Sequence, residues 1–129
     1  MNKLEAYSAP PNVAPPDRRQ HLRFQLAVQI ELRPDGTNVP MRLQTSDLGM
    51  GGCYVEIALT LDIGTKLDIA LWLDQQKVTM RGVVVTRHPQ FGNGIEFAGI
   101  GPESERLLNS FLDAHGSAWQ SNTPPFPIS

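Results

Sequence analysis

Hydrophobic residues recur at every second position near the start of the chain, and this is the strongest pattern in the sequence. They are Phe24, Leu26, Val28, Ile30 and Leu32. Strict alternation puts successive side chains on opposite faces of an extended chain, so it predicts a half-buried β-strand over residues 24–32. Pro34, Asp35 and Gly36 are typical of a turn. We therefore expect residues 39–48 to run back antiparallel to the first strand.

Four further segments have the length and composition of short strands. They are residues 53–57, residues 67–73, the run from Val78 and Met80 through residues 82–86, and residues 94–98. Gly64, residues 74–76 and a turn or bulge at residues 91–94 separate them. Residues 67–73 are apolar at nearly every position and should be buried. Six short strands with brief turns predict a mainly β fold, a small six-stranded antiparallel barrel.

The hydrophobic period changes from two residues to a helical spacing after Pro102. The apolar positions with this spacing are Leu107, Leu108, Phe111 and Leu112. Glu103 and Glu105 fall in the first turn, where negative charge is favourable, and Gly116 stands where a helix would end. The pattern predicts one C-terminal helix that covers an opening of the barrel.

The length of 129 residues predicts a single compact domain with flexible ends. Residues 1–17 are expected to form a flexible arm, because each proline removes a backbone donor and disfavours helix in the residue before it. The prolines of this arm are Pro10, Pro11, Pro15 and Pro16. Residues 18–115 form the predicted barrel domain with its helix. Residues 116–129, with three prolines and the isolated aromatics Trp119 and Phe126, are expected to be a flexible tail.

Charge and cysteine content narrow the classes of function. The formal net charge of −2 argues against a general role in binding DNA or RNA, since such affinity comes from many contacts of Lys and Arg with phosphate. The single cysteine, Cys53, cannot form an internal disulfide, and the three histidines have no ligand spacing for a metal. No signal peptide and no apolar run of ~20 residues are apparent, so we expect a cytoplasmic protein without membrane insertion. No catalytic set emerges, and an enzyme is not expected.

Local basic charge and a glycine-rich bend supply the candidate chemistry. Arg18, Arg19 and Arg23 offer planar guanidinium groups, which suit phosphate oxygens and stack on flat rings. Asp47 precedes Gly49 and Gly52 and can accept hydrogen bonds from a guanine edge. No helix is expected after Gly52 and no Lys-Ser/Thr pair follows, so this is not a Walker or Rossmann loop. The two segments together predict a nucleotide-sensing site.

In order and spacing, these motifs resemble the PilZ domain, the bacterial receptor for cyclic di-GMP, over roughly residues 17–114. Arg19 and Arg23 match the first motif of the family, two arginines separated by three residues, with Arg18 as an additional basic residue. Asp47 and Gly52 match the second motif, and Gly49 stands where the family has serine. The segments Leu61-Asp62-Ile63-Gly64 and Gly94-Ile95-Glu96-Phe97 are also similar to the family.

The resemblance implies a non-enzymatic receptor with cyclic di-GMP as its ligand and no cofactor. Arg19 and Arg23, with Arg18 in front of them, would hold the phosphates and stack on guanine. Asp47 would accept the guanine edge, and Gly52 would allow close approach of the backbone. Because a neutral hydrogen bond contributes about 0.5–1.5 kcal/mol, Gly49 in place of serine predicts weakened binding rather than none.

The resemblance also implies how such a receptor would signal. Ligand would change the conformation of the arginine loop, and the signal would pass through an unidentified protein partner, with a ligand-linked dimer as a further possibility. Motility and biofilm formation are outputs common in the family.

Two other interpretations stay open on the sequence. A divergent PilZ-like interaction module that no longer binds nucleotide is favoured by Gly49. An oligonucleotide-binding small barrel would need exposed aromatic residues between basic ones, for which Tyr54 and Phe24 are the candidates.

Overall fold

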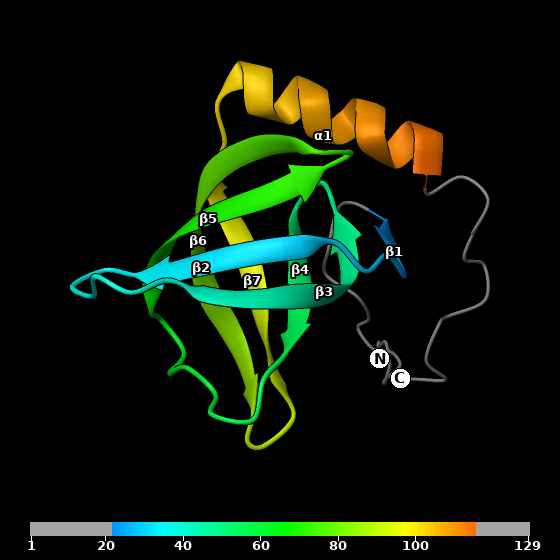
Figure 1. Cartoon of the computed structure of the whole chain (residues 1–129). Helices are drawn as coiled ribbons and strands as arrows, with labels where there is room; N and C mark the ends of the chain where they lie inside the picture. The colour runs from blue at the N-terminus through cyan, green and yellow to red at the C-terminus, as the bar shows by residue number, and fades with distance from the viewer. Residues whose placement is uncertain (1–21, 116–129) are drawn as a thin grey trace, which may run out of the picture.

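The computed structural model describes residues 22–115, and in this part of the chain it contains seven strands and one helix (Figure 1). The strands are β1 Arg23–Phe24, β2 Gln29–Pro34, β3 Met41–Gly49, β4 Gly52–Glu56, β5 Lys66–Leu73, β6 Gln76–His88 and β7 Gly92–Gly99. The helix is α1 Pro102–His115. The predicted flexible arm and tail lie outside the described residues, as do Arg18 and Arg19.

Six of the strands close into a ring. β2 pairs with β3 and β5, β3 with β4, β4 with β7, β7 with β6, and β6 with β5, every pair being antiparallel. This closure leaves no strand of the ring with an unpaired edge. The prediction of a six-stranded antiparallel barrel with a C-terminal helix is therefore confirmed. β1 is an addition to the ring, and it pairs with the far end of β3.

The predicted first strand over residues 24–32 is wrong as a single element, because the structure divides it into β1 and β2. Thr45 explains the division. Its hydroxyl donates to the Leu26 carbonyl at 2.6 Å and accepts the Val28 N–H at 2.9 Å. The Thr45 N–H in turn donates to the Val28 carbonyl at 2.9 Å. These bonds pair the backbone groups of Leu26 and Val28 although no regular strand ladder forms there. Inward and outward side chains therefore continue to alternate through the break.

The turn between β6 and β7 also differs from the prediction. Residues 92–94 already belong to β7, and the turn lies just before them. Asn93 is fully buried: its amide oxygen accepts the Leu61 N–H at 2.8 Å, and its amide nitrogen donates to the carbonyls of Leu61 at 3.0 Å and Thr86 at 3.2 Å. One side chain thus ties the long β4–β5 connection to the barrel wall.

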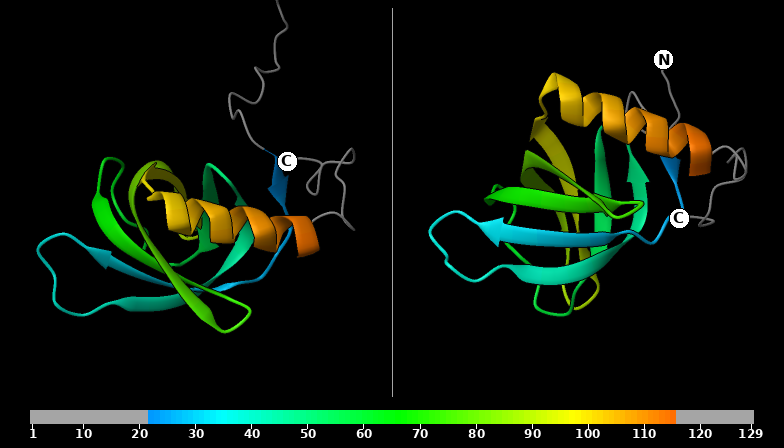
Figure 2. Two further views of the ribbon diagram at one scale, coloured as in Figure 1. Left: turned by 90° about the horizontal axis from the view of Figure 1, so that it is seen from above. Right: turned by 45° about the horizontal axis from the view of Figure 1, so that its top comes forward.

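The core fills the inside of the barrel and continues under the helix. Its largest fully buried apolar side chains are Ile30, Leu32, Leu48, Val55, Leu67, Ile69, Leu71, Val78, Val84, Ile95 and Leu108. α1 lies across one end of the barrel over β5 and β6, and adds Leu108 and Leu112 to the core (Figure 2). The predicted helix and its apolar face are confirmed. No helix within residues 22–115 is long and apolar enough to cross a membrane.

Candidate functional site

Four of the six predicted site residues come together where three strands meet. β1 supplies Arg23, β3 supplies Asp47 and Gly49, and β4 supplies Gly52. β1 pairs with the end of β3 so that Arg23 is opposite Gly49. Only two residues separate the end of β3 from the start of β4, so the second motif forms a tight hairpin beside β1. Arg23 of the first motif therefore lies beside the second motif in the fold.

Arg23 and Asp47 form an ion pair at this site. The Arg23 Nη1 donates to the Asp47 Oδ1 at 2.5 Å, and the two side chains are only 14% and 11% exposed. The register between β3 and β4 shifts between Thr45 and Asp47, which makes Ser46 an extra residue in β3. A bulge of this kind re-aims the side chains that follow it. Asp47 thus lies near the end of β3, within the strand predicted over residues 39–48.

The Arg23 side chain extends past the two glycines of the second motif. A Cβ atom added at Gly49 would lie 3.0 Å from the Arg23 Cδ and would collide with the Leu22 carbonyl oxygen. A Cβ atom added at Gly52 would lie 3.2 Å from the Arg23 Nη2 and would collide with the Ile95 carbonyl oxygen. At both positions the neighbouring backbone leaves no room for a side chain. The Arg23 side chain lies in the space beside the two glycines.

Cys53 lies directly after Gly52 and is fully buried. Burial raises the pKa of its thiol to about 12; the nearby Arg23 opposes this shift and Asp47 adds to it. A thiol with such a pKa is protonated near neutral pH and is a poor nucleophile. Cys53 is therefore a small buried residue of the core.

The two aromatic candidates for stacking on an oligonucleotide are both engaged within the protein. The Tyr54 hydroxyl and the His88 Nδ1 are 2.9 Å apart, and the two rings are tilted against each other. Burial raises the pKa of Tyr54, with smaller contributions from Glu56 and Asp47. Phe24 packs against the core. Among the aromatic residues within 22–115, only Phe91 is exposed, so the alternation of exposed aromatic and basic side chains that this interpretation needs is missing there.

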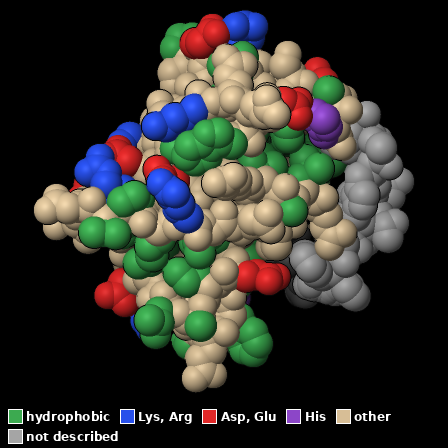
Figure 3. All heavy atoms as spheres, viewed as in Figure 1, with side chains coloured by type: hydrophobic (Ala, Val, Ile, Leu, Met, Phe, Trp, Pro, Cys, Tyr) green, Lys and Arg blue, Asp and Glu red, His purple; other side chains and the backbone are tan. Residues whose placement is uncertain are grey.

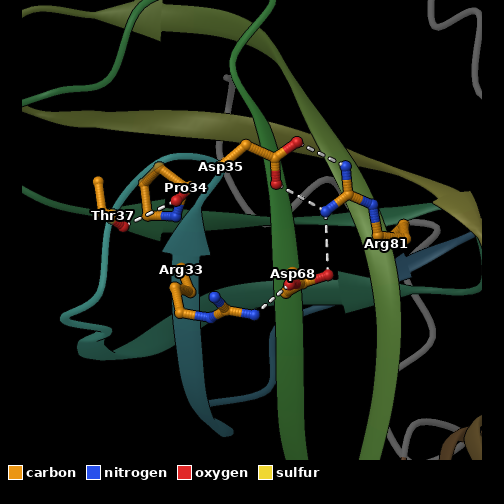
Figure 4. Close-up of polar contacts among 6 residues, drawn as sticks. All are labelled: Arg33, Pro34, Asp35, Thr37, Asp68 and Arg81. Carbon is orange, nitrogen blue, oxygen red and sulfur yellow. Dashed lines mark hydrogen bonds and ion pairs between the residues drawn. The ribbon is translucent and has the colours of Figure 1, made fainter.

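A second polar cluster lies on the outer face of β2, β5 and β6 (Figure 4). Asp68 accepts from Arg33 at 2.5 Å and from Arg81 at 2.9 Å, and Arg81 also makes two bonds to Asp35 at 2.8 and 2.9 Å. The bonds from Arg81 hold the pKa of Asp35 below its usual value, and those to Asp35 and Asp68 raise the pKa of Arg81.

Of these residues, Arg33, Asp68 and Arg81 border a hollow of about 430 Å³. In the space-filling view, acidic and basic side chains lie next to each other on this side of the barrel (Figure 3). Because the two arginines are already matched by carboxylates, this cluster fits a role in tying strands together better than capture of an anion.

The chain belongs to the PilZ domain family, since the family model described as PilZ domain matches residues 17–114. This match confirms the resemblance found in the sequence. No curated protein matches the sequence.

Solved structures give the same fold. The PilZ domain of YcgR from Escherichia coli with c-di-GMP is 16% identical with a TM-score of 0.63, covering 76% of this chain and 91% of that one. The inhibitor of motility MotI/DgrA from Bacillus subtilis is 19% identical with a TM-score of 0.62, covering 76% and 51%. The K. pneumonia MrkH complex with c-di-GMP is 16% identical with a TM-score of 0.62, also covering 76% and 51%. This chain therefore spans about half the length of the last two proteins. At such identities the similarity shows the fold alone.

Proposed function

We propose that this chain is a non-enzymatic receptor for cyclic di-GMP. The observation that carries the proposal is the position of Arg23, from the first motif, directly against Asp47 and Gly52 of the second. Membership of the PilZ family supports it, as do the fold neighbours YcgR and MrkH, whose structures contain c-di-GMP.

The proposed roles follow from the chemistry of each group. Cyclic di-GMP carries two phosphates and two guanines, so a receptor needs cations for the first and hydrogen-bond acceptors for the second. The Arg23 guanidinium would bind phosphate oxygens or stack on a guanine. The Asp47 carboxylate would accept the N–H groups of a guanine edge, and the missing side chain of Gly52 would let ligand approach the backbone. Arg18 and Arg19 enter the proposal through the family motif, as further cations.

The output of the receptor is also part of the proposal. Ligand would change the conformation of the arginine loop and create a surface for a protein partner, and two chains could share stacked ligands. Control of motility is a candidate output because fold neighbours include a motility inhibitor. Biofilm formation, the adaptor role and a cytoplasmic location stay predictions from the sequence.

The test is isothermal titration of cyclic di-GMP into the full chain. A charge-assisted hydrogen bond contributes about 1.5–3 kcal/mol, so Arg23→Ala should weaken binding at least about tenfold. Asp47→Ala should also weaken it. Arg42→Ala is the matched control, because Arg42 lies on β3 but is 75% exposed and pairs with Glu31. The Arg42→Ala variant should bind cyclic di-GMP with the affinity of the wild type. Cyclic di-AMP, which lacks the guanine edge, should bind weakly or not at all.

A second candidate is a PilZ-like interaction module without a nucleotide ligand. Gly49 in place of the family serine favours it, and so does the engagement of Arg23 with Asp47 inside the protein. No detectable heat at high micromolar cyclic di-GMP, together with an unchanged melting temperature, would reject the receptor and select this candidate.

A further inference from the structure

Arg23 occupies the space next to the groups that a ligand would use. Its side chain is only 14% exposed, its guanidinium is held by Asp47, and its stem lies along Gly49. A guanine edge at the Asp47 Oδ1 or a phosphate at the Arg23 Nη1 would have to compete with this internal ion pair. We call this arrangement the closed form of the site.

Gly49 is the residue that makes this closed form possible. Pairing of β1 with β3 brings the Leu22 carbonyl oxygen so near to Gly49 that any Cβ there would collide with it. A backbone oxygen cannot rotate away from such a contact, so one strand has to shift. β1 is the one that moves at less cost, because only two of its residues are paired, whereas β3 pairs with β2 and β4 as well.

We propose that Gly49 sets the affinity of the site by positioning Arg23: it lets β1 dock on β3 and place the arginine on Asp47, and ligand binding has to reverse this docking. The inference rests on the proposed function and specifies how the same site is regulated. Gly49 is a positioning residue in this account, since it acts through Arg23.

Substitutions at residue 49 separate this account from one based on the missing serine hydroxyl. Alanine adds a Cβ but no hydroxyl, so Gly49→Ala and Gly49→Ser should both lift β1 and both tighten binding. If the open form is populated at ~10% or less in the wild type, opening it fully tightens binding about tenfold or more. A merely structural role would lower affinity instead.

The experiment combines titration of cyclic di-GMP with amide hydrogen exchange of the free protein at residues 22–24 and 48–49. Gly99→Ala is the matched control, because Gly99 is exposed at the end of β7 and an added Cβ would make an ordinary 3.5 Å contact with Arg81. The inference predicts that both Gly49 variants exchange faster at these residues and bind cyclic di-GMP about tenfold more tightly. Gly99→Ala should show neither change.

The other outcomes overturn it in distinguishable ways. If the wild type binds and Gly49→Ala binds equally well or less well, the inference fails while the proposed function stands. Tighter binding by Gly49→Ser alone would assign the effect to the hydroxyl and also overturn it. If no form of the protein binds, the proposed function falls and the inference falls with it. Should the Gly49 variants fail to fold, Phe24→Ser removes the packing of β1 on the core by another route and must give the same increase in affinity.

Discussion

Arg23 and Asp47, which are 24 positions apart, bind each other through a 2.5 Å contact between guanidinium and carboxylate. Each lies in a motif predicted to contact a nucleotide, yet in the described structure they satisfy one another. Largely buried charges are stable only when they are paired, so the ion pair helps to hold β1 against the barrel. The position of each side chain therefore depends on the presence of the other.

Replacing Asp47 should therefore destabilise the fold as well as the site. Asp47→Ala leaves the guanidinium of Arg23 without its carboxylate partner in a largely buried position, and such a loss costs about 1–3 kcal/mol. Urea denaturation followed by circular dichroism measures the change in the free energy of unfolding. Asp62→Ala is the matched control: Asp62 is 85% exposed and pairs with Arg87 at 3.2 Å, so its loss should cost about 0–1 kcal/mol. Equal stabilities for the two variants would contradict a structural role for the Arg23–Asp47 pair.

The barrel was predictable because its signals are local. Several elements are specified without knowledge of their neighbours, by the alternation in β2, the nearly continuous apolar run of β5 and the helical spacing of Leu108 and Leu112. The break between β1 and β2 was not predictable. It depends on the hydroxyl of Thr45, which is distant in sequence and replaces ladder bonds without disturbing the alternation.

The members of the site were predictable from motifs, but their geometry was not. The chemistry of the two segments and their resemblance to the PilZ motifs placed Arg23 with Asp47, Gly49 and Gly52 in one predicted site. These four of the six predicted residues lie in the described structure as one cluster. That Asp47 binds Arg23 depends on the bulge at Ser46 and on the register of β1 against β3. In the sequence, Gly49 is notable only because the PilZ family has serine at this position. Its contact with the Leu22 backbone appears once the strands are paired.

The bonds of Thr45 can be tested by removing its hydroxyl at constant shape. Thr45 is 3% exposed, so Thr45→Val buries the Val28 N–H and the Leu26 carbonyl without these partners. Unsatisfied buried groups of this kind cost about 1–3 kcal/mol, which urea denaturation would detect. Thr79→Val, an exposed position on β6, is the control and should be within ~0.5 kcal/mol of the wild type. Thr45→Val with wild-type stability would show that the break between the strands does not depend on the hydroxyl.

Asn93 should tolerate even an isosteric change badly. In Asn93→Asp, a carboxylate replaces the amide nitrogen that donates to the carbonyls of Leu61 and Thr86, so oxygen faces oxygen in a fully buried position. An uncompensated buried charge costs about 3–5 kcal/mol, and we expect a loss of this order near neutral pH. Asn38→Asp, at an exposed turn, supplies the control and should leave the melting temperature nearly unchanged. A melting temperature as high for Asn93→Asp as for Asn38→Asp would refute the argument.

The buried thiol of Cys53 should make the protein less stable at alkaline pH. Its pKa rises from 9.0 to about 12 in the folded chain, mainly because burial disfavours the thiolate. The unfolded chain therefore loses this proton at lower pH than the folded chain. The corresponding stabilisation is fully present below pH 9 and is lost as the pH rises toward 12.

Other groups titrate in the same range, so the comparison is between the wild type and Cys53→Ala. Urea denaturation at a series of pH values above neutral gives the free energy of unfolding of both proteins. The wild type should fall more steeply with pH above about 9 than Cys53→Ala does. Parallel pH profiles would mean that the thiolate is accommodated in the folded state, for instance by the Arg23 guanidinium nearby, and that burial does not control this group.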